Sequence, residues 1–242
     1  MIVKKVNSKF NVIGFDADDT LWENENLFYE VQRKFKKILG NHNNDLDQEL
    51  LNIEKQNLEQ YGYGIKGFIL SLIETSTKLS NTNVGNEKIE EILNLGKKML
   101  SEPVKVLPYV KTSLESLSKD YNLILITKGD LLDQEKKIKG SELSKFFNHI
   151  EIVSEKNETT YMKILDKYNI NPEKFLMVGN SLKSDILPVT KIGGTGIYIP
   201  FELTWELEKV VYDHKSKAYV QLENISLIRP WLEKKLKNDN YS

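Results

Sequence analysis

The stretch Phe15–Trp22 reads FDADDTLW and follows directly on the apolar run Val12–Phe15, VIGF. Three carboxylates, those of Asp16, Asp18 and Asp19, are crowded together where that run ends. Like charges at such short range repel one another, and a strand that enters a hydrophobic core does not need them. The apolar run predicts a buried strand, and the carboxylates at its end indicate a site with a chemical purpose.

Composition restricts the classes of function. A chain of 242 residues indicates one large domain, or a domain with a sizeable insertion. Its 34 basic and 35 acidic side chains nearly cancel, so we expect neither nucleic acid nor a membrane as a partner. The absence of cysteine excludes disulfides, zinc–thiolate sites and thiol nucleophiles. No signal peptide or long apolar segment is recognisable, which favours a cytoplasmic location, and nothing indicates an oligomeric state.

Further apolar runs predict a parallel sheet. Leu123–Ile126 and Phe175–Val178 resemble the first strand, and Ile150–Val153 and Gly196–Ile199 are weaker examples. Alternation of such strands with helices is typical of an α/β fold with a doubly wound parallel sheet that is covered on both faces. The helical patterns between and after the strands are Tyr109–Lys119, Leu131–Lys139, Glu158–Tyr168, Ser184–Lys191 and Thr204–Val211.

The long segment between the first two strong strands breaks this alternation, because it contains helical patterns and no convincing strand. We therefore expect an all-helical cap domain at residues 23–103, and a catalytic core built from residues 1–22 and 104–242. The two ends of the insertion should be adjacent, as a lid requires. Its helical patterns are Asn24–Leu39, Asp45–Tyr61, Ile65–Leu79 and Asn86–Leu100.

Polar residues stand at the carboxyl ends of several strands, where ligands gather in an open parallel sheet. Thr127 and Lys128 end the second strand, Asn180 ends a later one with Asp185 beyond it, and Lys156 follows the weak strand at 150–153. An oxygen-only set of Asp and Asn suits a hard cation such as Mg²⁺. The hydroxyl of Thr127 and the charge of Lys156 could then hold a phosphoryl group that is being transferred.

At these residues the chain resembles the haloacid dehalogenase superfamily, phosphatase branch. FDADDT matches the first motif of the family, and LILIT, which ends at Thr127, matches the second. Lys156 matches the third motif, and MVGNSLKSD matches the fourth. The four motifs occur in family order over roughly Val12 to Tyr198. The resemblance implies a Rossmann-like core and a helical cap between the first two motifs.

The resemblance also implies roles. Asp16 would be the nucleophile and form an aspartyl-phosphate, while Asp18 would act as general acid and then as general base. Thr127, Lys128 and Lys156 would bind the phosphate. The metal ligands, for Mg²⁺, would come from Asp16, Asp18, Asn180 and Asp185. The family usually has Asp where this chain has Asn180, which removes one negative charge, and Asn157 stands where proline is common.

Other interpretations stay open at this point. A phosphomutase would keep the same residues, whereas a 2-haloacid dehalogenase has no need of Asp18 as an acid. A non-enzymatic phosphoacceptor module of the receiver type would be shorter and lack the insertion, and a catalytically silent protein would not need Asp16, Asp18, Thr127 and Lys156. Taken alone, Thr127 could cap the next helix, and Ser181 or Ser184 could cap a strand–helix turn. The substrate we expect is a small phosphate ester.

Two loops could face the site. YGYGIKGF at Tyr61–Phe68 interrupts the helical pattern of the insertion, and the family uses such a loop for substrate choice. An ordinary helix–helix turn with packed aromatic residues explains it equally well. GGTGIYIPFELTW at residues 193–205 is a second loop that could reach the crevice.

Overall fold

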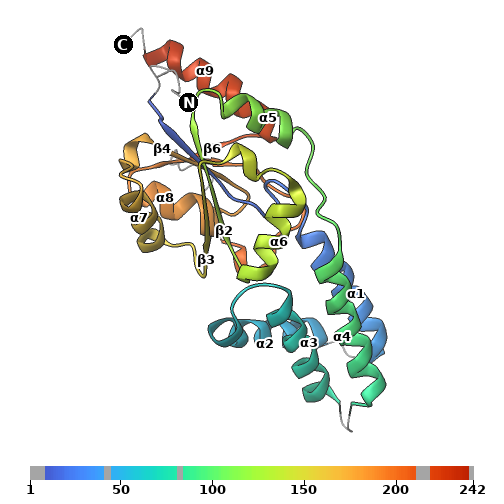
Figure 1. Ribbon diagram of the computed structural model, residues 1–242. Coiled ribbons are helices and arrows are strands. Elements are labelled where there is room, and N and C mark those ends of the chain that lie inside the picture. Colours follow the sequence, from blue (N-terminus) through green and yellow to red (C-terminus); the bar gives the residue numbers. More distant parts are fainter. Residues whose placement is uncertain (1–8, 41–44, 81–83, 211–218, 240–242) are drawn as a thin grey trace.

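The computed structural model describes residues 9–40, 45–80, 84–210 and 219–239. Its centre is a six-stranded, all-parallel sheet with the strand order β3-β2-β1-β4-β5-β6 (Figure 1). The fold is therefore the predicted α/β fold with a Rossmann-like core. The strands are β1 (Val12–Phe15), β2 (Asn122–Lys128), β3 (His149–Val153), β4 (Phe175–Gly179), β5 (Thr195–Tyr198) and β6 (Tyr219–Gln221).

Strand β1 lies in the middle of the sheet, between β2 and β4. Gly14 of β1 is in register with Ile124 on one side and Met177 on the other. All four of its residues are buried, as the apolar run predicted. From β1 the sheet continues with β2 and β3 on one side, and with β4, β5 and β6 on the other. Open α/β sheets bind their ligands at such a change in the direction of strand order. The five predicted strands are confirmed, whereas β6 was not predicted.

Helices cover both faces of the sheet, and alternate strand residues face them. Ile13 and Phe15 point into a core with α5 and α9, while Val12 and Ile124 pack toward α7 and α8. This alternation follows from the two-residue repeat of a strand. The helices are α5 (Val110–Leu117), α6 (Leu131–Ser141), α7 (Glu158–Lys167), α8 (Leu187–Lys191) and α9 (Ile228–Asp239).

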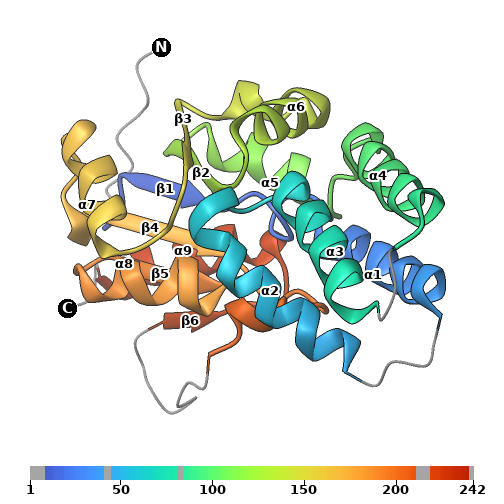
Figure 2. The same cartoon turned by 90° about the horizontal axis from the view of Figure 1, so that it is seen from below.

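The segment between β1 and α5 contains four helices and, among its described residues, no strand. We call residues 25–101 the helical insertion. It has its own hydrophobic core, in which Phe35, Leu50, Leu72 and Ile92 are buried. Seen from below, α2 lies across the end of the sheet and α3 lies beside α2 (Figure 2). The helices are α1 (Glu25–Leu39), α2 (Leu46–Tyr61), α3 (Ile65–Leu79) and α4 (Asn86–Ser101).

The two ends of the insertion are paired with each other. Trp22 and Val106 form an antiparallel bridge. The amide of Glu23 donates to the carbonyl of Lys105 at 3.0 Å, and the amide of Leu107 donates to that of Leu21 at 2.9 Å. The insertion therefore leaves and rejoins the core through one pair of hydrogen-bonded segments, which we call the paired ribbon. The two ends of the insertion are thus adjacent, as we expected from the sequence.

One predicted helix is wrong. Residues 204–210 form a loop with a single 3₁₀ turn, η4 (Glu206–Glu208), and Val211 lies outside the described residues. A contact with the segment after β4 holds this loop, because Lys183 donates to the carbonyl of Leu207 at 2.7 Å. The predicted helix Ser184–Lys191 is divided into a π-helical turn, η3 (Leu182–Ile186), and α8. Among the described residues, none of the helices is both long and apolar enough to span a membrane.

Candidate active site

Asp16 lies immediately beyond β1 and is buried. Its amide still pairs with β4, because it donates to the carbonyl of Val178 at 2.9 Å. Its carboxylate accepts hydrogen bonds from Thr20 Oγ1 at 2.8 Å and from Lys156 Nζ at 2.5 Å. Burial, with the charge of Asp185, raises the pKa of Asp16 to about 7, although Lys156 opposes this shift. A buried carboxylate is thus held at the end of the central strand.

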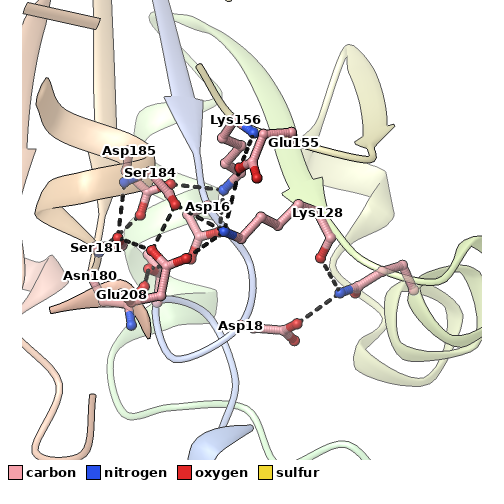
Figure 3. A network of polar contacts seen from close by, with 12 residues as sticks. Asp16, Asp18, Lys128, Glu155, Lys156, Asn180, Ser181, Ser184, Asp185 and Glu208 are labelled. Carbon is pink, nitrogen blue, oxygen red and sulfur yellow. Dashed lines mark hydrogen bonds and ion pairs between the residues drawn. The ribbon is translucent and has the colours of Figure 1, made fainter. Parts of the chain in front are cut away.

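Lys156 bridges two carboxylates from different parts of the chain. Its ammonium lies 2.5 Å from Asp16 Oδ1 and 2.8 Å from Asp185 Oδ1, and it is 4% exposed (Figure 3). Burial alone would lower the pKa of Lys156, but the charges of Asp16 and Asp185 raise it well above its ordinary value. The predicted convergence of the first, third and fourth motifs is therefore present in the structure.

Asp18 is held from another direction. Its carboxylate accepts from Trp22 Nε1 and Gln134 Nε2, each at 2.7 Å, and from Lys137 Nζ at 3.1 Å. Figure 3 shows this carboxylate reaching away from Asp16. The chain turns directly after the strand, because the carbonyl of Ala17 accepts the amides of the next turn. The turn therefore begins at Ala17, between the two carboxylates.

Asp19 has a local structural role that the sequence did not reveal. Its backbone is left-handed, with φ of 62°, a conformation that Asp tolerates better than most residues. Its carboxylate accepts the amides of Asn24 at 2.8 Å and of Glu25 at 3.1 Å, at the start of α1. Burial raises its pKa to about 7, and these two amides oppose the shift. Asp19 therefore fixes the first helix of the insertion to the loop that carries Asp16.

Thr127 and Lys128 end β2 beside this loop. The Thr127 hydroxyl is buried and has no hydrogen-bond partner among the described residues, so it is available to a ligand. It is not a helix cap, since Asp130 caps α6 by accepting the amide of Asp133. The ammonium of Lys128 lies 2.5 Å from Glu208 Oε1 and 2.9 Å from Ser184 Oγ.

Asn180 faces three oxygens. The end of its carboxamide lies 3.1 Å from Asp16 Oδ2, 3.2 Å from the carbonyl oxygen of Asp18 and 3.3 Å from Thr20 Oγ1. With its nitrogen turned toward them, the amide donates to all three. With its oxygen turned toward them, acceptors face acceptors, and a cation is what stabilises such an arrangement. The donor set of Asp16, Asn180 and a main-chain carbonyl therefore fits a hard divalent ion.

The two remaining predicted metal ligands contribute differently. The side chain of Asp18 is bound to α6, and only its carbonyl faces Asn180. Asp185 uses Oδ1 for Lys156 and accepts the amide of Ser181 on Oδ2 at 3.0 Å. Within the described chain, no three His, Cys, Asp or Glu side chains are grouped as metal ligands. A site here would therefore depend on the Asn180 oxygen and on the main chain.

A glycine makes room for this arrangement. A Cβ at Gly179 would lie 2.2 Å from Asp185 Oδ2, far inside van der Waals contact. Since Asp185 is almost fully buried and paired with Lys156, it cannot move aside without loss of that ion pair. The glycine before Asn180 is therefore required by the close approach of a side chain and not by a turn.

A cavity of about 760 Å³ lies between the core and the helical insertion. Both loops that the sequence singled out line it, through Tyr63 and Trp205, whose rings meet edge to face at 6.0 Å. Tyr63 also donates to Glu155 at 2.6 Å and lies beneath the ammonium of Lys128, 4.0 Å from the ring centre. The Tyr61–Phe68 loop therefore contacts the core at the mouth of the site.

Three further residues belong to the site but were missed. Gln134 and Lys137, three positions apart on α6, both contact Asp18. Glu208 accepts from Lys128, from Ser181 at 2.5 Å and from Ser184 at 2.6 Å. The helical spacing of Gln134 and Lys137 was visible in the sequence, but nothing local connected it to Asp18. Glu208 was hidden inside the segment wrongly predicted as a helix.

Comparisons with known proteins show which family this sequence matches. The family model for haloacid dehalogenase-like hydrolases matches residues 10–193. A haloacid dehalogenase-like family hydrolase from Xanthomonas campestris, of known structure, is 35% identical, covers 98% of each chain and superposes with a TM-score of 0.85.

Two relatives with phosphatase names are more distant. A glyceraldehyde 3-phosphate phosphatase of Pyrococcus furiosus is 26% identical over 90% of this chain and 92% of its own length. An N-acylneuraminate-9-phosphatase of Mus musculus is 24% identical over 74% of this chain and 77% of its own.

Proposed function

The chain belongs to the haloacid dehalogenase-like hydrolase family, and on that premise we propose that it is a Mg²⁺-dependent phosphomonoester hydrolase acting on a small phosphorylated metabolite. The observation that carries the proposal is the position of Lys156, which links Asp16 to Asp185 beside the oxygens that face Asn180. The phosphatase names of the relatives support it.

In the first step, an oxygen of Asp16 attacks the phosphorus of the ester. A bond forms between that oxygen and phosphorus, the bond from phosphorus to the alcohol oxygen breaks, and an aspartyl-phosphate results. Lys156 neutralises charge on the nucleophile and on the phosphoryl oxygens. Water then attacks the same phosphorus, so that Asp16 and inorganic phosphate are released.

Asp18 carries the proton in both steps. It donates a proton to the leaving alcohol oxygen, and it removes one from the attacking water. Its contacts with Gln134 and Lys137 hold it on the side of α6, so its carboxylate has to turn toward the phosphoryl group in each cycle. These two residues would act through Asp18 and are therefore positioning residues.

The phosphate would be held by Thr127, by the adjacent main chain and by Lys156. The free, buried hydroxyl of Thr127 supports this role. The side chain of Lys128 is occupied by Glu208 and Ser184, so we assign it to binding through its backbone amide. Donors that are fixed before the substrate arrives stabilise charge without the cost of reorganisation.

Mg²⁺, when bound, would neutralise the crowded oxygens and polarise the phosphoryl group. Asp16, the carbonyl of Asp18 and the carboxamide of Asn180 would hold it, and Asp185 would support the site through Lys156. Asn180 in place of the usual Asp leaves the site with one negative charge fewer, so we expect weaker binding of the metal.

The substrate would occupy the cavity between core and insertion. In this proposal residues 23–103 form a cap over a core of residues 1–22 and 104–242. A volume of about 760 Å³ accommodates a phosphorylated metabolite. A phosphomutase of the same family would keep Asp16 and Asp18, and it differs in that it returns the phosphoryl group to a sugar.

The test is hydrolysis of p-nitrophenyl phosphate with and without Mg²⁺. We expect turnover that EDTA abolishes and Mg²⁺ restores, and that falls by at least roughly a thousandfold in Asp16→Asn. Asp166→Asn, on the exposed face of α7, is the matched control and should keep the wild-type rate. A purified protein that releases no phosphate from a broad panel of esters would refute the proposal.

A further inference from the structure

The wall of the cavity that the helical insertion supplies has an excess of negative charge. Its charged members are Glu25 of α1, Glu54 of α2, Lys36 and Asp47. Lys36 and Asp47 pair with each other at 2.6 Å. Glu25 and Glu54 remain, and in the described parts of the chain neither carboxylate forms an ion pair. The part of the cavity wall that the insertion supplies is therefore acidic.

Both carboxylates are partly buried, which makes their charge costly. Burial, followed by the charges of Asp19 and Glu54, raises the pKa of Glu25 to about 8. Burial raises the pKa of Glu54 to about 7, although a hydrogen bond from Trp205 opposes the shift. No cation of the described chain acts against the effect of burial at either carboxylate. A cation bound in the cavity would stabilise the charged form of both carboxylates.

Among the described residues that line this cavity, no lysine is unpaired. Every lysine that lines it is already ion-paired within the described chain, so an anionic substituent on the substrate alcohol would meet no free positive charge. The pairs are Lys36 with Asp47, Lys128 with Glu208, Lys137 with Asp18, Lys156 with Asp16 and Lys209 with Glu206.

An unpartnered acceptor also lies in the cavity wall. Gln134 is 2% exposed, and its amide nitrogen donates to Asp18 and to the carbonyl of Lys128. Its oxygen has no hydrogen-bond donor among the described residues. A buried acceptor without a partner destabilises the protein, so we expect a ligand to donate a hydrogen bond to this oxygen. The Gln134 oxygen is thus an unpartnered acceptor that lines the same cavity as Glu25 and Glu54.

We propose that the preferred substrate is a phosphate monoester whose alcohol carries an ammonium group, which Glu25 and Glu54 bind while the phosphate lies at Asp16 and Lys156. This inference rests on the proposed phosphatase function. An ammonium supplies both the positive charge and the N–H donors that the acidic wall lacks. A neutral polyol supplies donors alone, and a carboxylate supplies neither.

The test compares three esters that share a six-carbon skeleton and a terminal phosphate. Glucosamine 6-phosphate carries an ammonium, glucose 6-phosphate carries only hydroxyls, and 6-phosphogluconate carries a carboxylate. We expect kcat/KM to fall in that order, with the first at least roughly tenfold above the second. O-phosphoethanolamine against phosphoglycolate repeats the comparison on a two-carbon skeleton, so that the shape of the sugar does not decide the outcome.

Substitutions locate the preference. Glu25→Gln and Glu54→Gln should each raise KM for glucosamine 6-phosphate more than for glucose 6-phosphate, and the double variant should remove the preference. Glu30→Gln on α1 and Glu59→Gln on α2 are matched controls, because both residues are exposed and neither lines the cavity. The controls should keep the wild-type ratio. Thermal melting of each variant checks that it is folded.

The outcomes separate the two proposals. If p-nitrophenyl phosphate and every other ester stay intact, the phosphatase function fails, and this inference fails with it. If p-nitrophenyl phosphate is hydrolysed but the ammonium esters show no advantage on either skeleton, the inference alone is overturned. A preference for ammonium esters that survives the double variant overturns the assignment to Glu25 and Glu54.

Discussion

The side-chain nitrogen of Gln134 lies 2.7 Å from Asp18 Oδ2, and this contact joins α6 to the loop after β1 across 116 positions of the chain. Lys137, one helical turn further on, adds a charged hydrogen bond to the same carboxylate. The residue to which we assign proton transfer is thus oriented by a helix outside the four motifs.

Substitution on α6 should therefore affect turnover. We expect Gln134→Leu and Lys137→Met each to lower kcat by roughly tenfold, since general acid–base catalysis depends on placement of the carboxylate. KM for p-nitrophenyl phosphate should change little, because neither residue touches the phosphate. Lys136→Met, exposed on the same helix, is the control. An unchanged kcat in both variants would show that Asp18 does not need these contacts.

Lys156 should matter for stability as well as for activity. Lys156→Met leaves Asp16 and Asp185 buried without their common cation, and removal of one partner from such a group costs about 3–5 kcal/mol of unfolding free energy. Urea unfolding in EDTA measures this loss. Lys163→Met, on the exposed side of α7, should leave the midpoint within experimental scatter. Equal midpoints for the two variants would contradict the prediction.

Glu54 should make stability depend on pH. Its pKa rises from an ordinary 4.5 to about 7 in the folded protein, mainly because of burial. Between these values the folded state binds more protons than the unfolded state, so stability falls as pH rises. Glu54→Gln should flatten this fall and raise the melting temperature at pH 7 more than at pH 4.5. The idea fails if the two melting curves shift in parallel across that range.

Tyr63 should control how well substrates bind. It is the residue of the helical insertion that contacts Lys128, Glu155 and Trp205 together. We expect Tyr63→Ala to raise KM by roughly tenfold for esters that fill the cavity, because an aromatic residue and its hydrogen bond are lost. Tyr61→Ala, two positions away and 48% exposed, is the matched control. A similar KM in both variants would remove Tyr63 from the binding site.

Sequence reasoning succeeded where a signal is local. All four residues of the apolar run Val12–Phe15 are buried, and β1 has the predicted bounds. The positions of Asp16, Thr127 and Lys156 followed from one topological rule, that parallel strands present their carboxyl ends at one edge. Their joint location was therefore predictable before any contact was known.

It failed where long-range contacts decide. The segment at 204–210 has a helical pattern, yet the Glu208 side chain binds Lys128 and two serines, and the segment remains a loop. Contacts of this kind outweigh a weak helical propensity. Asp19 was seen as one of three similar carboxylates, and only its bonds to the amides of α1 distinguish it.

The bridge between Trp22 and Val106 has a consequence for how this architecture can be altered. Because both connections run through one paired ribbon, the segment beyond it can change in length or composition without shifting the register of β1 against β2. A chimaera made by cutting on the outer side of that ribbon should keep its catalytic machinery intact. A cut on the inner side of the ribbon would separate the loop that carries Asp16 from the bridge between Trp22 and Val106.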